Sequence, residues 1–151
     1  MLYKNGGYTL IEVVMVIIVL GILASVSIPS FKNIPIQAKK SGCKSTLGGF
    51  RQAISIYNVD NIVTTGISLW PVLDTLSTVG AVMDHEIPQN PFQDKSNAPD
   101  SIVEGFTMGV VVGTRGGWAY KPSTGEIWPN TNTTIPGSGC GGPVNINENN
   151  W

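Results

Sequence analysis

The sequence predicts an α+β fold in which a long N-terminal helix packs on a small antiparallel β-sheet head, and three observations lead to this prediction. No residue from Val13 to Phe31 carries a charge. Apolar residues then recur at helical spacing, at Leu47, Phe50 and Ile54. In the second half of the chain, short β-branched and aromatic segments are bounded by Gly and Pro, which is typical of strands.

The uncharged run is long enough to cross a membrane. Its about 19 residues would measure roughly 28 Å as a helix, close to the hydrocarbon thickness of a bilayer. The helical pattern continues beyond it to about Asn58. We therefore divide the chain into a short polar leader (1–7), a hydrophobic transmembrane stem (8–31), an amphipathic half of the same helix (32–59) and a globular head (60–151).

The head is expected to hold a short helix, a hairpin and an irregular tail. Pro71 suits the first helical position and Gly80 the end of the helix, with a buried side formed by Leu73, Leu76 and Val79. Residues 87–92 are expected to be extended, because a residue before Pro avoids the helical region. Strands are predicted at 106–112, 118–121 and 126–128, the last two joined by a hairpin turn at 122–125, and little regular structure is expected in 130–151.

Composition favours a loop-rich extracytoplasmic domain over a cytosolic enzyme. Only 13% of the 151 residues are charged, while Gly (18) and Pro (10) are plentiful. The charges are also segregated, because six Lys and Arg residues up to Arg51 oppose Glu12 alone, whereas acidic residues predominate beyond it. A basic stem and an acidic head would help to order many copies in one assembly; two separately solvated faces are the simpler interpretation.

The most informative motif is Gly7-Tyr8-Thr9-Leu10-Ile11-Glu12, which places one carboxylate at the start of the apolar run. With the apolar residues 13–23, it resembles the N-terminus of type IV pilins and of the pseudopilins of type II secretion. In that family, a prepilin peptidase cleaves after the residue that corresponds to Gly7 and methylates the new amine, here that of Tyr8. Phe is commoner than Tyr at this position. Gly21 and Pro29 also match the family in spacing, and the helix between such positions can lose its regular hydrogen bonds in filaments.

The resemblance implies a pilin-like fold and a structural subunit that polymerises through its stem into a pilus or a secretion pseudopilus, without enzymatic turnover. The implied partners are other copies, related minor subunits, the prepilin peptidase, an inner-membrane assembly platform with its cytoplasmic ATPase, and membrane lipid before assembly. The N-terminus would be cytoplasmic and the head extracytoplasmic, first at the bacterial inner membrane and then in a periplasmic or cell-surface filament. The distribution of positive charge opposes this orientation, because four lysines (32, 39, 40 and 44) follow the stem and Lys4 alone precedes it.

Glu12 is expected to set the register of assembly. A lone carboxylate among packed apolar stems costs several kcal/mol, whereas one paired with a neighbour's Tyr8 amine costs much less. The alternative is a helix-entry carboxylate that interacts only with the positive end of the helix dipole.

Within the head, the residues resemble the family in outline. Residues 87–92 and 116–127 are similar to segments of pilin and pseudopilin heads, with a closing hairpin that carries Trp118 and Tyr120. Major pseudopilins often carry Asp-Pro-Trp-Gly where this chain has residues 90–93 as Asn-Pro-Phe-Gln. The choice between pilin and pseudopilin therefore stays open.

Cys43 and Cys140 form a candidate disulfide that would tie the tail to the helix. For a loop near 100 residues, the chain-entropy model gives about 4 to 5 kcal/mol of stabilisation. Two independent thiols are the alternative.

The implied function requires no cofactor. Major pseudopilins, however, hold calcium in a loop of the head. Asp94, Asp100 and Glu104 could supply oxygen ligands, but their spacing is not ordered, so solvated loop acids are the favoured interpretation. His85 has no second histidine or cysteine nearby and indicates neither a zinc site nor a catalytic base. Nucleic-acid binding is not expected, because the basic residues lie near the membrane or within a filament wall.

The competing hypothesis is a membrane-anchored or secreted extracytoplasmic binding module with an ordinary signal sequence. Ser25-Val26-Ser27 offers the small residues that a signal peptidase recognises. Glu12 counts against this interpretation, because it lies where a signal sequence should already be apolar.

Overall fold

The computed structural model describes residues 7–31, 34–135 and 144–151, without the side chains of Val26, residues 28–31, Ile135, Val144 and Asn145. The chain divides into two compact units, Met1–Ala38 and Lys39–Trp151. Each unit is described separately below.

The first unit is built around α1 (Leu10–Phe31). Its described apolar side chains are exposed around the whole helix, from Leu10 at 82% to Val14 at 39%. The sequence predicts a transmembrane stem over residues 8–31. Among the described residues, no helix combines the length and the apolar character that crossing a membrane requires.

The head is organised on α2 (Ile34–Thr65), which runs beyond the predicted end near Asn58. Side chains three or four residues apart share one face of a helix. The buried face of α2 follows this rule, with Cys43, Leu47, Phe50, Ile54 and Asn58. This face forms the helical half of the hydrophobic core.

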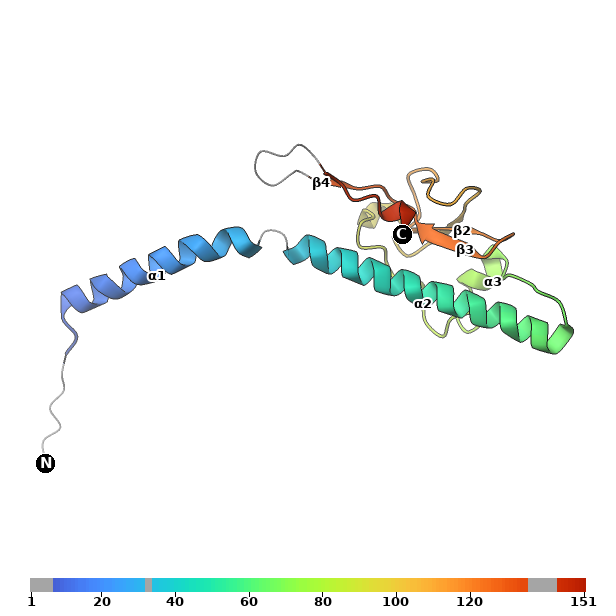
Figure 1. Cartoon of the computed structure of the whole chain (residues 1–151), viewed down its shortest axis with the longest axis horizontal. Coiled ribbons are helices and arrows are strands. Elements are labelled where there is room, and N and C mark those ends of the chain that lie inside the picture. The colour runs from blue at the N-terminus through green and yellow to red at the C-terminus, as the bar shows by residue number, and fades with distance from the viewer. Residues whose placement is uncertain (1–6, 32–33, 136–143) are drawn as a thin grey trace, which may run out of the picture. The chain divides into compact units, whose positions relative to one another are not determined.

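A three-stranded sheet supplies the other half of the core, with the strand order β1-β2-β3. The strands are β1 (Ile102–Glu104), β2 (Trp118–Lys121) and β3 (Glu126–Pro129). β2 and β3 form the predicted antiparallel hairpin, and β1 pairs with β2 in parallel. Figure 1 shows β2 and β3 lying along α2.

Aromatic residues of β2 join this sheet to the helix and to the loops. The Trp118 ring meets Phe50 edge to face at a centroid distance of 5.0 Å, and its Nε1 donates to the Pro88 carbonyl at 2.7 Å. The Tyr120 hydroxyl donates to the Pro71 carbonyl at 2.8 Å. Both residues are fully buried, so these bonds satisfy polar groups that would otherwise destabilise the core.

The α+β fold class is confirmed, whereas several of its expected details are wrong. The sheet is mixed rather than antiparallel, because the first strand is Ile102–Glu104 and residues 106–112 form no strand. The short helix α3 spans Leu73–Ser77, after Pro71, and Val79 is exposed. The tail holds the two-stranded pair β4 (Thr134–Ile135) and β5 (Val144–Asn145), in addition to the short helix η2 (Glu148–Asn150).

Candidate functional site

The residues of the N-terminal motif form a hydrogen-bonded cap at the start of α1. The Glu12 Oε2 atom accepts from the Thr9 amide and from the Thr9 hydroxyl, each at 2.8 Å. In return, the Glu12 amide donates to Thr9 Oγ1 at 3.3 Å. This reciprocal arrangement is a capping box, in which two side chains satisfy backbone donors that the first turn of a helix leaves free.

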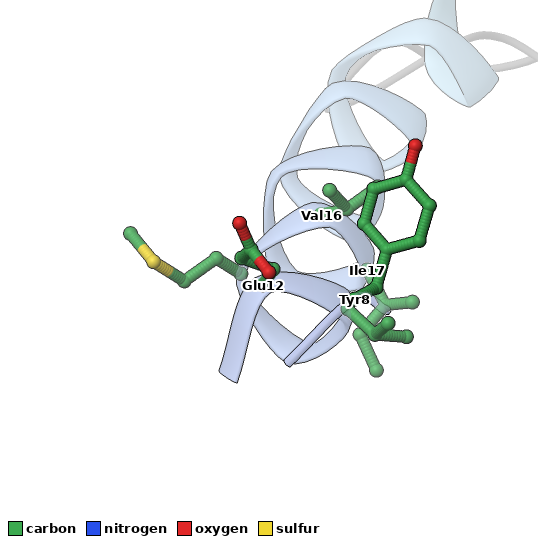
Figure 2. Close-up of a pocket in the computed structure, with 6 residues that line it drawn as sticks. Tyr8, Glu12, Val16 and Ile17 are labelled. Carbon is green, nitrogen blue, oxygen red and sulfur yellow. The ribbon is translucent and has the colours of Figure 1, made fainter. Parts of the chain in front are cut away.

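The cap occupies only part of the Glu12 carboxylate. Among the described residues, Glu12 Oε1 accepts no hydrogen bond, and the side chain is exposed. Figure 2 shows the ring of Tyr8 and the carboxylate of Glu12 on different sides of the first turn of α1. The carboxylate is therefore fixed in orientation by Thr9 while one of its oxygens stays available to a partner.

An apolar surface surrounds this carboxylate. A shallow groove on α1 is lined by Tyr8, Glu12, Val13, Met15, Val16 and Ile17 (Figure 2). Tyr8 is 89% exposed. An exposed apolar helix with a single carboxylate at its start can bury a large area against similar helices, and it can direct one positive group to one position.

The two other predicted assembly positions both lie in α1. At Gly21, an added Cβ would meet nothing within 4 Å, so no contact among the described residues requires glycine there. Pro29 lies two residues before the end of the helix, and its side chain is outside the described set. Their roles in assembly stay predictions.

A second unpartnered apolar surface lies on α2. Ile56, Val59 and Val63 are 60%, 56% and 78% exposed and share one helix face. Together with Gln52, Ser55 and Asp60 they line a shallow groove. At 3.6 residues per turn, this stripe falls on the side of α2 opposite to the face that packs on the sheet.

Cys43 is a fully buried free thiol among the described residues. Its Sγ lies 3.9 Å from Asn90 Oδ1. Burial, followed by the nearby charge of Glu148, raises the pKa of this thiol to about 12. Cys140 lies outside the described residues, so the disulfide with Cys43 stays a prediction.

The acidic residues suggested as calcium ligands are not assembled into a site. Asp94 accepts from the amide and the hydroxyl of Ser96, and these bonds hold the pKa of its carboxyl below the ordinary range. Asp100, Glu104 and His85 are exposed. The described residues contain no group of three His, Cys, Asp or Glu side chains that could hold a metal ion.

Two structural features were missed by the sequence reasoning. The capping box could have been predicted from the sequence, because Thr9 and Glu12 have the Thr-x-x-Glu spacing at the start of an apolar run. The burial of the Glu148 carboxylate could not have been predicted, because this residue lies in a polar tail whose sequence gives no indication of burial.

Comparison with known proteins is consistent with this N-terminal geometry. Residues 2–28 match the prokaryotic N-terminal methylation motif. Type II secretion system core protein G of Pseudomonas aeruginosa is 36% identical over 58 residues, which cover 38% of this chain and 41% of that protein. The type IV narrow pilus major component PilA5 of Thermus thermophilus is 36% identical over 56 residues, or 37% of this chain and 48% of that protein.

A third relative, the type IV major pilin protein PilA of Myxococcus xanthus, is 41% identical over 44 residues, which cover 29% of this chain and 20% of that protein. The chain thus spans less than half the length of these curated relatives. No solved structure matches it. Residues 2–28 thus carry a prokaryotic N-terminal methylation motif, and the relatives that share the N-terminal part of the chain are type II secretion core proteins G and type IV pilins.

Proposed function

We propose that this protein is a structural subunit of a type IV pilus-like filament or of a type II secretion pseudopilus. Prepilin peptidase cleaves it after Gly7 and methylates the Tyr8 amine, and copies then polymerise through α1. One observation carries the proposal. Within the methylation motif, Thr9 caps α1 through one oxygen of the Glu12 carboxylate, and the apolar side chains that follow are exposed among the described residues.

The charge of Glu12 gives assembly its register. In a core of packed apolar helices, an unpaired carboxylate costs several kcal/mol, and most of this cost is recovered when a neighbour's positive Tyr8 amine reaches Oε1. Thr9 already holds Oε2, which reduces the freedom that the side chain loses on pairing. Since the amine does not exist before cleavage after Gly7, assembly depends on processing.

Before assembly, the apolar surface of α1 would reside in the bacterial inner membrane, with the head on the extracytoplasmic side. An assembly platform and its ATPase would then move subunits from the bilayer into the filament. The exposed stripe of Ile56, Val59 and Val63 on α2 supports contacts with neighbouring copies outside the central helix bundle.

The capping box permits a test that separates pairing from helix capping. A capping box accepts glutamine as well as glutamate at N3, the position three residues after the N-cap. The variant Glu12→Gln therefore preserves the cap but removes the charge. Thr9→Val removes the cap and retains the charge, at a cost of about 1 kcal/mol at the helix start. We expect Glu12→Gln to abolish filaments in a sheared-filament assay, and Thr9→Val to lower the yield only in part.

Glu104→Gln provides the control, because it neutralises an exposed acid of the head. This variant should assemble as the wild type does. Immunoblots of the membrane fraction establish that each variant accumulates equally. Normal filament yield from Glu12→Gln, combined with failure of Thr9→Val, would show that Glu12 acts as a helix cap and not as the partner of an amine.

A further inference from the structure

Four lysines gather where the second unit begins, and we name them the basic cluster. Lys39, Lys40 and Lys44 lie close together near the start of α2. Lys95, the first residue of the short helix η1 (Lys95–Asn97), lines one groove together with Lys39. Lys40 is half-buried, and the other three side chains are exposed. None of the four takes part in the single ion pair of the described residues, so the cluster is free to bind an anion.

The groove between Lys39 and Lys95 carries more positive than negative charge. Its remaining side chains are uncharged except for Asp94. One oxygen of that carboxylate already accepts from the amide and the hydroxyl of Ser96. Lysine is a flexible point charge with three donors, which suits the oxygens of a phosphate group.

Two aromatic rings adjoin the cluster. Lys44 Nζ lies 4.7 Å from the centroid of the Trp151 ring, and Trp151 meets Phe92 edge to face at 6.1 Å. Both rings are only partly buried. Tryptophan is enriched where proteins meet the headgroups of a membrane, because its ring is amphipathic, and lysine side chains extend their charge towards the same region. Lysines beside partly exposed rings are therefore typical of a surface that contacts lipid headgroups.

The position of the cluster along the chain favours lipid over other anions. Lys39 closely follows Phe31, the last residue of α1, in the sequence. The chain thus tethers the cluster to the segment that the proposed function places in a bilayer, which raises the local concentration of headgroups. Acidic residues of another copy could also pair with the lysines, but before assembly no such tether brings them near.

We propose that the basic cluster binds the phosphate groups of anionic phospholipids and holds the head on the membrane surface before assembly. This inference rests on the proposed function, because it requires α1 to anchor the chain in a bilayer. Each lysine near an anionic membrane surface strengthens the association roughly fivefold. Incorporation into a filament must break these contacts, so the lipid charge regulates the release of subunits from the membrane. The lysines that oppose the usual orientation rule thereby gain a role.

Energy transfer from tryptophan to a labelled lipid measures this contact, because all four tryptophans lie between residues 70 and 151, outside the stem. The full chain is reconstituted into vesicles that contain a dansyl-labelled lipid, made of phosphatidylcholine alone or with added phosphatidylglycerol. We expect phosphatidylglycerol to increase the transfer. The increase should disappear when the ionic strength is raised from about 0.1 M to about 1 M, which shortens the screening length from roughly 10 Å to roughly 3 Å.

The double variant Lys39→Gln/Lys40→Gln removes two cations of the cluster and leaves Lys44 and Trp151 in place. Association of its head with the membrane should weaken on the order of 25-fold, the product of two fivefold factors, so most of the increase in transfer is lost. Lys39→Arg/Lys40→Arg retains the charge and should respond as the wild type does. In the matched control, Lys121→Glu lowers the net charge by the same amount at the end of β2 and should also respond as the wild type does. Circular dichroism establishes that each variant is folded.

Equal transfer in the two kinds of vesicle, or a full increase in the folded double variant, would overturn the proposal. An increase that requires many chains per vesicle would assign the lysines to acidic surfaces of other copies and would equally overturn it. Flotation of the vesicles at high salt separates this inference from the proposed function. A wild-type chain that salt releases from the vesicles would contradict anchoring by α1, whereas an anchored chain that does not respond to phosphatidylglycerol would contradict the lipid inference alone.

Discussion

At the scale of single residues, the sequence alone leaves two alternative roles open for Glu12. Its position predicted either a register-setting charge or a carboxylate at the helix dipole. The structure adds a third contribution, because Thr9 and Glu12 form a capping box that orients the carboxylate and leaves Oε1 free. The local motif could be predicted from the sequence, whereas a pairing with another copy depends on a group that one unprocessed chain does not contain.

Cys43 gives the head a measurable alkaline sensitivity. Its folded pKa of about 12 exceeds the ordinary value of 9.0, so the fold favours the neutral thiol. The stabilisation is complete below pH 9 and is lost as the pH rises from 9 to about 12, by up to about 1.4 kcal/mol per pH unit. Burial also raises the pKa of Tyr120 to about 12, from an ordinary value of 10.0, which adds a similar loss only above pH 10.

Urea unfolding under reducing conditions, from pH 8 to pH 10, measures this effect. The free energy of unfolding of wild type should fall more steeply than that of Cys43→Ala once the pH passes 9. Parallel curves for the two proteins would show that the fold does not perturb the Cys43 thiol.

At the scale of elements, the regular periodicity of the helix made it predictable, whereas the sheet depended on contacts between distant segments. The hairpin of β2 and β3 was predicted from its turn and its aromatic residues. The parallel partner β1 was missed because its three residues carry too little pattern. The composition of residues 106–112 predicts a strand, but the segment forms bends, a turn and irregular structure, and Phe106 and Val110 are exposed.

Two glycines illustrate how the same residue type has opposite roles in different elements. An added Cβ at Gly117, beside β2, would lie 1.8 Å from the Pro99 carbonyl oxygen, whereas at Gly48 on α2 it would meet nothing within 4 Å. We expect Gly117→Ala to destabilise the head by at least about 2–3 kcal/mol, because backbone atoms must move. Gly48→Ala should stabilise it by about 0.5–1 kcal/mol through helix propensity.

Chemical denaturation of the purified variants measures both changes. A wild-type free energy of unfolding for Gly117→Ala would contradict the close approach of β2 to residue 99. A destabilised Gly48→Ala would show that this face of α2 is covered in the isolated chain.

At the scale of the whole molecule, the sequence predicted an apolar N-terminal helix and a small α+β head, and both are present. It did not predict the buried polar groups of the tail, because their burial follows from where η2 packs and not from a local pattern. The proposed filament function links two events in the first unit: processing at Gly7 creates the amine, and the amine then pairs with Glu12 at the start of α1 of a neighbouring copy.

Mass spectrometry of the N-terminal peptide of the mature protein tests this account most directly. The account predicts a peptide that begins at Tyr8 and carries one methyl group on its α-amine, with Gly7 as the last residue removed. A mature protein that begins at Ile28 would indicate an ordinary secreted protein, and one that retains Met1 would indicate a plain membrane anchor. Either result would contradict the dependence of assembly on a new Tyr8 amine.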